Sequence, residues 1–490
     1  MAAAAATIGQ RIRVRRRLST RAGTYLQLDV TRLHGLSAQA VLLAALRRAV
    51  APHSTAAGLY VWLEGHGRTG NGDHLDHVVG WLTSLQPALF TAEDAVPARL
   101  VDAARSVHCQ LSAAPDAGTS FGDTVLRRPG SALHRWLSDG GLPQITFNYL
   151  GQPADGADRI LQTAPGPDNA TIGDRNVLPT PVDLTVAPAL DGTVTCEFSV
   201  DPALFDAEEV RQVADRFSTE LETAARLVPL TAAPLADPAR ILILIHPVGG
   251  LLDWYKPLVA GLGPNWDCYG IPRDRTCDDT AMQALARSYL ARIRAAHPTG
   301  RYTLAGWCLG GPLAYEIALQ AHADGEGDRI DDVILLDPPR AETPTNSHDI
   351  LITHIHNACP HQTRSIVVEA LAATEQLGIP ERAAALVARL GLAGPGSSDY
   401  PLLGQMLMRL GDHAAMDSWR PTGQLPHLRL CLPQAVTPGS ENAGESWRSH
   451  AAALTVTVVP GDHESMLTSE ELHRALTAPC DSHPHQANGR

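Results

Sequence analysis

The carboxyl-terminal half of the chain alternates between short apolar runs and longer stretches with helical periodicity. Residues 241–246 (ILILIH) form a continuous apolar run, which is typical of a parallel strand buried on both faces. Residues 279–297 repeat apolar residues at helical spacing, from Met282 to Ile293. Alternation of this kind predicts a parallel α/β sheet with helices on both faces. The other predicted strands of this half are 266–272, 301–306, 331–337, 427–433 and 453–460. Its other predicted helices are 251–262 and 309–323.

The alternation stops between about residues 338 and 424. Helical patterns at 363–377 and 380–392 fill the interval before the apolar strands resume. An insertion of helices after a central strand is typical of a lid that covers an active site. We therefore predict a helical lid over about 338–424.

The chain divides near residue 230. Its 490 residues exceed the size of one typical domain, and the stretch VPLTAAPLADPAR is short and rich in proline and alanine, as linkers are. A long loop is predicted at 151–170. We predict a first domain at 1–229, a linker at 230–240, a second domain at 241–480 and a tail at 481–490.

Composition narrows the class of protein. The chain is 44% hydrophobic and 19% charged, which allows ample cores, and its formal charge of −13 argues against a nucleic-acid partner. Its eight cysteines are scattered without C-x-x-C pairs, which indicates reduced thiols and a cytoplasmic location. No apolar run reaches the length of a membrane span, and a monomer is expected. The basic run RIRVRRR is interpreted as a solvated edge or a domain start, with a transit peptide as the alternative.

The stretch GWCLGG at 306–311 carries candidate chemistry. It follows a predicted strand and opens a predicted helix, and it fits the G-x-S-x-G turn of α/β hydrolases with cysteine in place of serine. Gly306, Gly310 and Gly311 allow strand, turn and helix to approach closely. The amino terminus of a helix also stabilises a thiolate. An isolated cysteine is more often a core residue, but this context predicts that Cys308 is a nucleophile.

Such a nucleophile needs a base, and the base needs a carboxylate that orients it. In α/β hydrolases the acid and then the histidine follow the nucleophile along the chain. Asp337 ends the strand in VILLDPP, and His463 lies just past the last strand in VVPGDHESML. Both residues fall at carboxyl ends of strands, on the same edge of the sheet as Cys308. The sequence therefore predicts the triad Cys308, Asp337 and His463.

The oxyanion of a tetrahedral intermediate needs backbone N–H donors. We predict these donors at Leu309, directly after the nucleophile, and at Val248 in the loop HPVGG after the first strand. His246 of that loop is assigned a structural hydrogen-bonding role. No metal site is predicted, because four possible zinc ligands in HIHNACPH would not share one face of a helix; they are His354, His356, Cys359 and His361.

These motifs resemble those of the thioesterase domains that end nonribosomal peptide synthetases. The matching stretches are HPVGG, GWCLGG, LLDPP and VVPGDHESML, and they span nearly all of 240–477. The resemblance implies an α/β-hydrolase fold with a helical lid. It also implies transfer of a peptidyl chain from the phosphopantetheine thiol of a carrier protein onto the nucleophile, and release by hydrolysis or intramolecular attack. No cofactor bound by this chain itself is expected.

The first half resembles the carboxyl-terminal half of an epimerisation domain, a relative of condensation domains. The matching stretches VWLEGHGR, VVGWLTSLQP and ITFNYLGQ lie within about 20–228. The resemblance implies an α+β half-domain of the chloramphenicol acetyltransferase type. Glu64 matches the motif glutamate of that family, whereas its H-H-x-x-x-D motif has no copy in this sequence. We therefore expect a scaffolding or carrier-docking role rather than epimerisation.

Cysteine in place of serine changes the expected outcome of the reaction. Acyl transfer to Cys308 keeps a thioester, which stays reactive toward a weak or strained internal nucleophile. We expect release by cyclisation, with closure of a β-lactam ring, as in the monobactam-forming type, as one form of it. Hydrolytic release, an editing thioesterase and a non-enzymatic docking module are the alternatives. Trp254 and Trp307 are candidate pocket residues.

Overall fold

The structure, a computed structural model, separates into two compact units, Met1–Ala225 and Arg226–Arg490. The predicted boundary at residue 229 lies slightly further along the chain. Most of the predicted linker, the predicted loop from 152 and the tail lie outside the described residues. The structure describes residues 6–53, 58–68, 78, 80, 82–91, 99–114, 121–122, 127, 130–131, 134–135, 142–151, 173–177, 180–189, 192–231, 240–273, 281–341, 351–352, 355–356, 362–390, 400–436 and 442–478.

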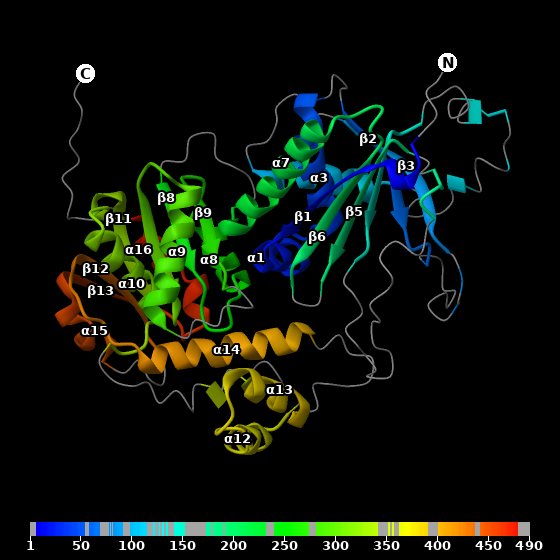
Figure 1. Cartoon of the computed structure of the whole chain (residues 1–490). Helices are drawn as coiled ribbons and strands as arrows, with labels where there is room; N and C mark the ends of the chain where they lie inside the picture. The colour runs from blue at the N-terminus through cyan, green and yellow to red at the C-terminus, as the bar shows by residue number, and fades with distance from the viewer. Residues whose placement is uncertain are drawn as a thin grey trace, which may run out of the picture. The chain divides into compact units, whose positions relative to one another are not determined.

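The first unit is built on a six-stranded mixed sheet (Figure 1). Its elements are β1 (Ile12–Leu18), α1 (Thr20–Thr24), α2 (Val30–His34), α3 (Ala38–Val50), β2 (Gly58–Gly65), β3 (Ser84–Thr91), α4 (Leu100–Ser112), β4 (Ile145–Tyr149), β5 (Val182–Pro188), β6 (Val194–Val200) and α7 (Ala207–Arg226). The strand order is β1-β6-β5-β4-β2-β3, and only the pairs β2–β4 and β4–β5 are parallel. This arrangement confirms the α+β expectation for the first half.

One face of this sheet is buried against helices. Buried and half-buried residues alternate along β2, β5 and β6, as expected for strands with one face in a core. Phe198 of β6 meets Phe217 of α7 edge-to-face, with ring centroids 5.7 Å apart. The basic run predicted to form an edge is β1, which pairs with β6 and ends the sheet. There Arg15 pairs with Glu197 across the two strands.

The second unit is built on a seven-stranded sheet in the order β13-β12-β11-β10-β8-β9-β7. Its strands are parallel except for β7, a two-residue edge strand antiparallel to β9. Its elements are β7 (Val228–Pro229), β8 (Arg240–Ile245), α8 (Lys256–Gly261), β9 (Trp266–Ile271), α9 (Met282–Ala296), β10 (Tyr302–Trp307), α10 (Gly310–Ala323), β11 (Ile330–Leu336), α12 (Arg364–Ala372), α13 (Ile379–Arg389), α14 (Tyr400–Ser418), β12 (Leu425–Pro433), α15 (Ala443–Ser446), β13 (Ala451–Val459) and α16 (Glu470–Thr477).

This sheet confirms the predicted α/β-hydrolase order. All six predicted strands are present, and every residue of β10 is buried, because the central strands are covered on both faces. The predicted lid interval holds α12, α13 and α14, and α14 runs beside the other two helices (Figure 1). The boundary differs from the expected one because Val228 pairs with Gly270 of β9, which assigns β7 to the second unit.

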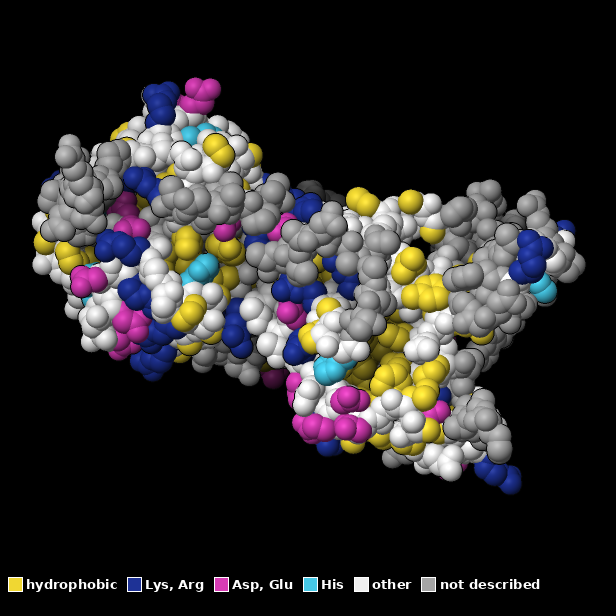
Figure 2. All heavy atoms as spheres, turned by 90° about the horizontal axis from the view of Figure 1, so that it is seen from above, with side chains coloured by type: hydrophobic (Ala, Val, Ile, Leu, Met, Phe, Trp, Pro, Cys, Tyr) yellow, Lys and Arg dark blue, Asp and Glu magenta, His cyan; other side chains and the backbone are white. Residues whose placement is uncertain are grey.

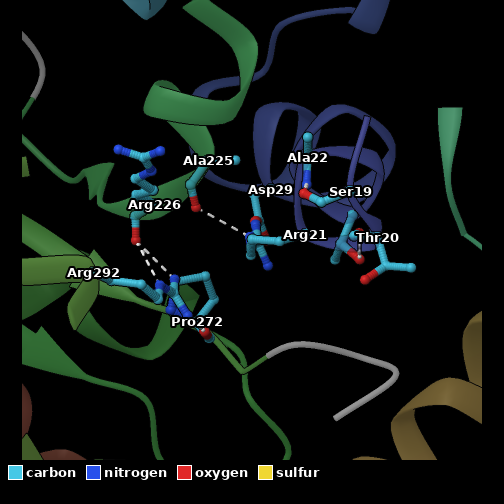
Figure 3. A network of polar contacts seen from close by, with 10 residues as sticks. Ser19, Thr20, Arg21, Ala22, Asp29, Ala225, Arg226, Pro272 and Arg292 are labelled. Carbon is cyan, nitrogen blue, oxygen red and sulfur yellow. Dashed lines mark hydrogen bonds and ion pairs between the residues drawn. The ribbon is translucent and has the colours of Figure 1, made fainter. Parts of the chain in front are cut away.

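Arginine side chains donate to backbone carbonyl groups within each unit (Figure 3). In the first unit Arg21 pairs with Asp29, and its Nε donates to the Ala225 carbonyl at 3.1 Å. In the second unit Arg292 donates to the Arg226 carbonyl from Nε at 3.0 Å and from Nη2 at 2.7 Å. These bonds supply donors to carbonyls that have no partner within α7.

The face drawn in Figure 2 shows no large area that is covered by side chains of one charge. Acidic and basic side chains lie interspersed there. The net charge of −13 is therefore not expressed as a single acidic region on that face. Among the described helices, none is both long and apolar enough to cross a membrane.

Candidate active site

Cys308 lies on a sharp turn between β10 and α10. Its φ of 58° is in the left-handed region, which costs on the order of 1–3 kcal/mol for a non-glycine residue. The turn is held by the Cys308 N–H, which donates to the Leu336 carbonyl at 3.0 Å, and by the Gly311 N–H, which donates to the Cys308 carbonyl at 3.1 Å. A Cβ at Gly306 would lie 1.9 Å from the Gly310 carbonyl oxygen, so only glycine fits there. The half-buried thiol stands at the amino end of α10.

Asp337 and His463 form a hydrogen-bonded pair beside this thiol. Asp337 follows β11 and is 2% exposed, and its Oδ2 lies 2.6 Å from Nδ1 of His463, which follows β13. The Cys308 side chain lies close enough to His463 to act on the pKa of its ring. Burial lowers the pKa of His463, but the hydrogen bonds and charges of Asp337 and Cys308 outweigh burial and raise that pKa to about 10. The three residues predicted as a triad thus come together from the ends of three strands.

Two aromatic residues hold this arrangement. The Trp307 indole Nε1 donates to the His463 carbonyl at 2.8 Å, and the two rings lie 4.5 Å apart between centroids. The Tyr255 hydroxyl accepts the Trp307 N–H at 2.8 Å and donates to the Ile245 carbonyl at 2.6 Å. Sequence analysis missed both roles, because these bonds join residues that are distant in the chain. Trp254 is 41% exposed, with its ring 5.4 Å from that of Trp307, so these two rings form an aromatic wall beside the site.

The loop at 246–250 follows β8 and faces the topological switch point of the sheet. β8 lies between β9 and β10, so the loop after β8 and the turn after β10 flank the crevice where α/β sheets bind ligands. Val248 and Leu309, the predicted oxyanion donors, are both buried in these two segments. His246 is fully buried, and its ring nitrogens lie 2.8 Å from the Pro247 carbonyl oxygen and 2.6 Å from the Tyr289 hydroxyl. Burial lowers the pKa of His246 to about 3, so its ring is neutral at pH 7.

Glu64 lies on β2 of the first unit. Asn148 of β4 donates to its Oε2 at 2.6 Å, and burial raises the pKa of this half-buried carboxyl group. Asp183 of β5 contributes a second carboxyl group nearby, and burial together with the charge of Glu64 raises the pKa of Asp183 to about 6. This pair is more easily protonated than ordinary surface carboxylates.

Of the four possible zinc ligands at 354–361, one lies among the described residues. His356 is described, whereas His354, Cys359 and His361 lie outside the described residues. Within the described ranges no three histidine, cysteine or carboxylate side chains are grouped as a metal site would need.

Two known protein families match the chain, one in each half. Residues 240–480 match the family described as Thioesterase domain, and residues 11–232 match the family described as Condensation domain. The first match contains the Cys308 turn, Asp337 and His463, and the second contains Glu64. A thioesterase domain implies an enzyme that acts by acyl transfer.

The similar proteins include two synthases. The N-(5-amino-5-carboxypentanoyl)-L-cysteinyl-D-valine synthase of Amycolatopsis lactamdurans is 28% identical over 303 residues, which are 57% of this chain and 8% of that protein. A dimodular nonribosomal peptide synthase of Bacillus subtilis (strain 168) is 31% identical over 134 residues, which are 25% of this chain and 5% of that protein. The chain therefore spans only a small fraction of the length of these relatives.

Two solved structures are similar to parts of the chain. The NocB thioesterase domain from the nocardicin cluster is 21% identical, with a TM-score of 0.34, and the match covers 49% of this chain and 95% of that one. The epimerization domain from the third module of tyrocidine synthetase B is 22% identical, with a TM-score of 0.39, and the match covers 46% of this chain and 50% of that one.

Proposed function

We propose that this chain, in which a condensation-domain region precedes a thioesterase domain, releases a peptidyl group from a carrier-protein phosphopantetheine thioester through an acyl-Cys308 intermediate. One observation carries the proposal. Cys308 lies close enough to His463 to raise the pKa of its ring, and His463 Nδ1 lies 2.6 Å from the buried carboxylate of Asp337. Such an arrangement activates a nucleophile in covalent catalysis.

In the proposed first step, His463 holds the proton of Cys308, and the thiolate attacks the thioester carbonyl carbon. A bond forms between the Cys308 sulfur and that carbon, and the oxyanion accepts the N–H groups of Leu309 and Val248. The bond from the carbon to the phosphopantetheine sulfur then breaks, and that sulfur takes the proton from His463. The high pKa of His463, about 10, supports its role as the holder of this proton.

In the proposed second step, a nucleophile of the peptidyl group itself attacks the acyl-Cys308 carbonyl. His463 accepts the proton of this nucleophile, and the Cys308 thiolate leaves, so that a ring is released. A thioester intermediate supports this outcome, because it retains more reactivity than the ester that a serine would form. Closure of a four-membered lactam is one form of the reaction, and the lid helices would exclude water from the intermediate. Hydrolysis, with water as the nucleophile, is the second candidate function.

For the first unit we propose a scaffolding or carrier-docking role. Glu64 bonds to Asn148, and its raised pKa would suit proton transfer. However, the sequence has no H-H-x-x-x-D motif to supply the histidine that should work with this glutamate. Epimerisation by this chain alone is therefore not proposed.

The test uses a synthetic peptidyl N-acetylcysteamine thioester. Intact-protein mass spectrometry should show an acyl adduct that C308A abolishes, whereas C109S, which removes an exposed cysteine of the first unit, should retain it. C308S should still acylate but should shift the product from ring to linear acid. Absence of an adduct, or its persistence in C308A, would refute the nucleophile, and a purely linear acid from the unaltered chain would refute cyclisation.

A further inference from the structure

The loop at 246–250 leaves one amide available for the oxyanion. Pro247 has no N–H, and three other amides of the loop are committed to acceptors: His246 N–H to the Ile271 carbonyl at 3.1 Å, Gly249 N–H to the Asp412 carboxylate at 2.9 Å and Gly250 N–H to the Pro247 carbonyl at 3.0 Å. Within the described part of the chain, the Val248 N–H has no such acceptor. The local hydrogen bonds therefore select Val248 as the donor from this loop.

Asp412 of α14 is the side chain that binds this loop. Its Oδ2 accepts the Gly249 N–H, and its Oδ1 lies 2.8 Å from Nη1 of Arg273, which follows β9. Asp412 is 0% exposed and Arg273 is 2% exposed, so the ion pair is fully enclosed. Removing one partner of a buried ion pair strongly destabilises the fold, because the other charge is left buried without compensation. The two side chains must therefore stay together.

The loop also packs closely against these two elements. Gly249 and Gly250 have φ values of +89° and +76°, which favour glycine. A Cβ at Gly250 would lie 2.8 Å from the Arg273 Cβ and 3.0 Å from the Met408 sulfur. Loop, arginine and α14 therefore cannot shift independently of one another.

Helix α14 belongs to two hydrophobic cores. Met406 and Leu410, toward its amino end, lie in the core that α12 and α13 form. Ala415 and Met416, toward its carboxyl end, lie in the main core of the second unit. Asp412 stands between these two sets, at the point where the lid joins the sheet domain.

We propose that Asp412, held by Arg273, is a positioning residue that fixes the 246–250 loop for oxyanion binding by Val248 and couples this loop to the lid helix. The inference rests on the proposed function, because it assumes that an acyl group is transferred to Cys308. Asp412 itself does not touch the reacting atoms. It acts by occupying the Gly249 amide, so that the neighbouring Val248 amide alone is left for substrate.

The test compares D412N with D332N. Asparagine at position 412 keeps one oxygen that can accept the Gly249 N–H, but it has no charge to pair with Arg273. Asp332 is a matched control in the same unit, because its buried carboxylate also accepts a backbone amide, that of Val333 at 2.9 Å, and also forms an ion pair with an arginine, Arg429 at 2.7 Å. Asp332 lies on β11 and does not contact the 246–250 loop in the described structure.

Two rate constants are measured on the full chain. Acylation by a peptidyl N-acetylcysteamine thioester uses the oxyanion donors, whereas alkylation of Cys308 by iodoacetamide does not. For D412N we expect acylation about 10- to 100-fold slower, with little change in KM, and an unchanged rate of alkylation. A displaced oxyanion donor should slow acylation less than a deleted one, which costs about 10²–10³ in kcat. For D332N we expect both rates unchanged. R273K, a milder change to the same pair, should slow acylation in the same selective way and replaces D412N if that variant does not fold.

The outcomes separate this inference from the proposed function. Normal acylation in folded D412N or R273K, equal slowing in D332N, or a parallel loss of acylation and alkylation would each overturn the positioning role. Acylation that persists in C308A would instead overturn the proposed function. Selective loss of acylation in D412N, with C308A inactive, supports both.

Discussion

The Tyr255 hydroxyl joins the two strands that carry the proposed oxyanion loop and nucleophile. Tyr255 is fully buried, and its hydroxyl accepts the Trp307 N–H at 2.8 Å and donates to the Ile245 carbonyl at 2.6 Å. Ile245 is the last residue of β8, and Trp307 directly precedes Cys308. The substitution Tyr255→Phe removes one oxygen atom and leaves both backbone groups without their partner.

The cost follows from these two bonds. A buried backbone group that loses its partner costs about 1–3 kcal/mol, so Y255F should lower the free energy of unfolding of the second unit by about 2–6 kcal/mol, taking both groups together. Native-state hydrogen exchange measures this change, because about 1.4 kcal/mol corresponds to a tenfold factor. Peptides from β8 and β10 should exchange about 30- to 20,000-fold faster. Acylation of Cys308 should also slow, since the turn and the loop lose their common support.

Tyr302 provides the matched control on β10. It is as buried as Tyr255, but its hydroxyl has no hydrogen-bond partner among the described residues. The substitution Tyr302→Phe removes the same atom without breaking a bond, and it should change the free energy of unfolding by less than about 0.5 kcal/mol or stabilise slightly. Equal exchange rates in Y255F and Y302F would refute the reasoning.

Two further changes test the site and its turn. D337N should lower the pKa of His463 from about 10 toward 6.5, and NMR titration of ¹⁵N-labelled histidine would measure this; an unchanged titration midpoint would contradict it. A raised pKa stabilises the fold below pH 6.5, and this contribution fades as the pH rises toward 10. D337N should therefore lower the free energy of unfolding in urea more at pH 7 than at pH 10. G306A should abolish folding of the second unit by circular dichroism, because the added Cβ would lie 1.9 Å from the Gly310 carbonyl oxygen, whereas G444A, whose Cβ would have nothing closer than 3.7 Å, should fold normally.

Local sequence signals predicted the strands and the turn for definite physical reasons. A strand covered on both faces must be apolar throughout, so the run at 241–246 predicted β8 almost to the residue. The Cys308 turn depends on close approach of backbone atoms, which only glycine at 306 allows. The edge strand β7 has only two residues and no pattern of its own, so its place in the second sheet could not be predicted from the sequence.

The sequence by itself determined the order of strands and helices and the candidate residues Cys308, Asp337 and His463, because each depends on residues adjacent in the chain. Only the tertiary structure decided how these groups are held. Asp412 lies 163 positions from the Gly249 amide that it binds, and Tyr255 lies 52 positions from Trp307. Neither bond leaves a periodic or local trace in the sequence, since a buried hydrogen bond depends on where the folded chain brings two polar groups together and not on their spacing along it.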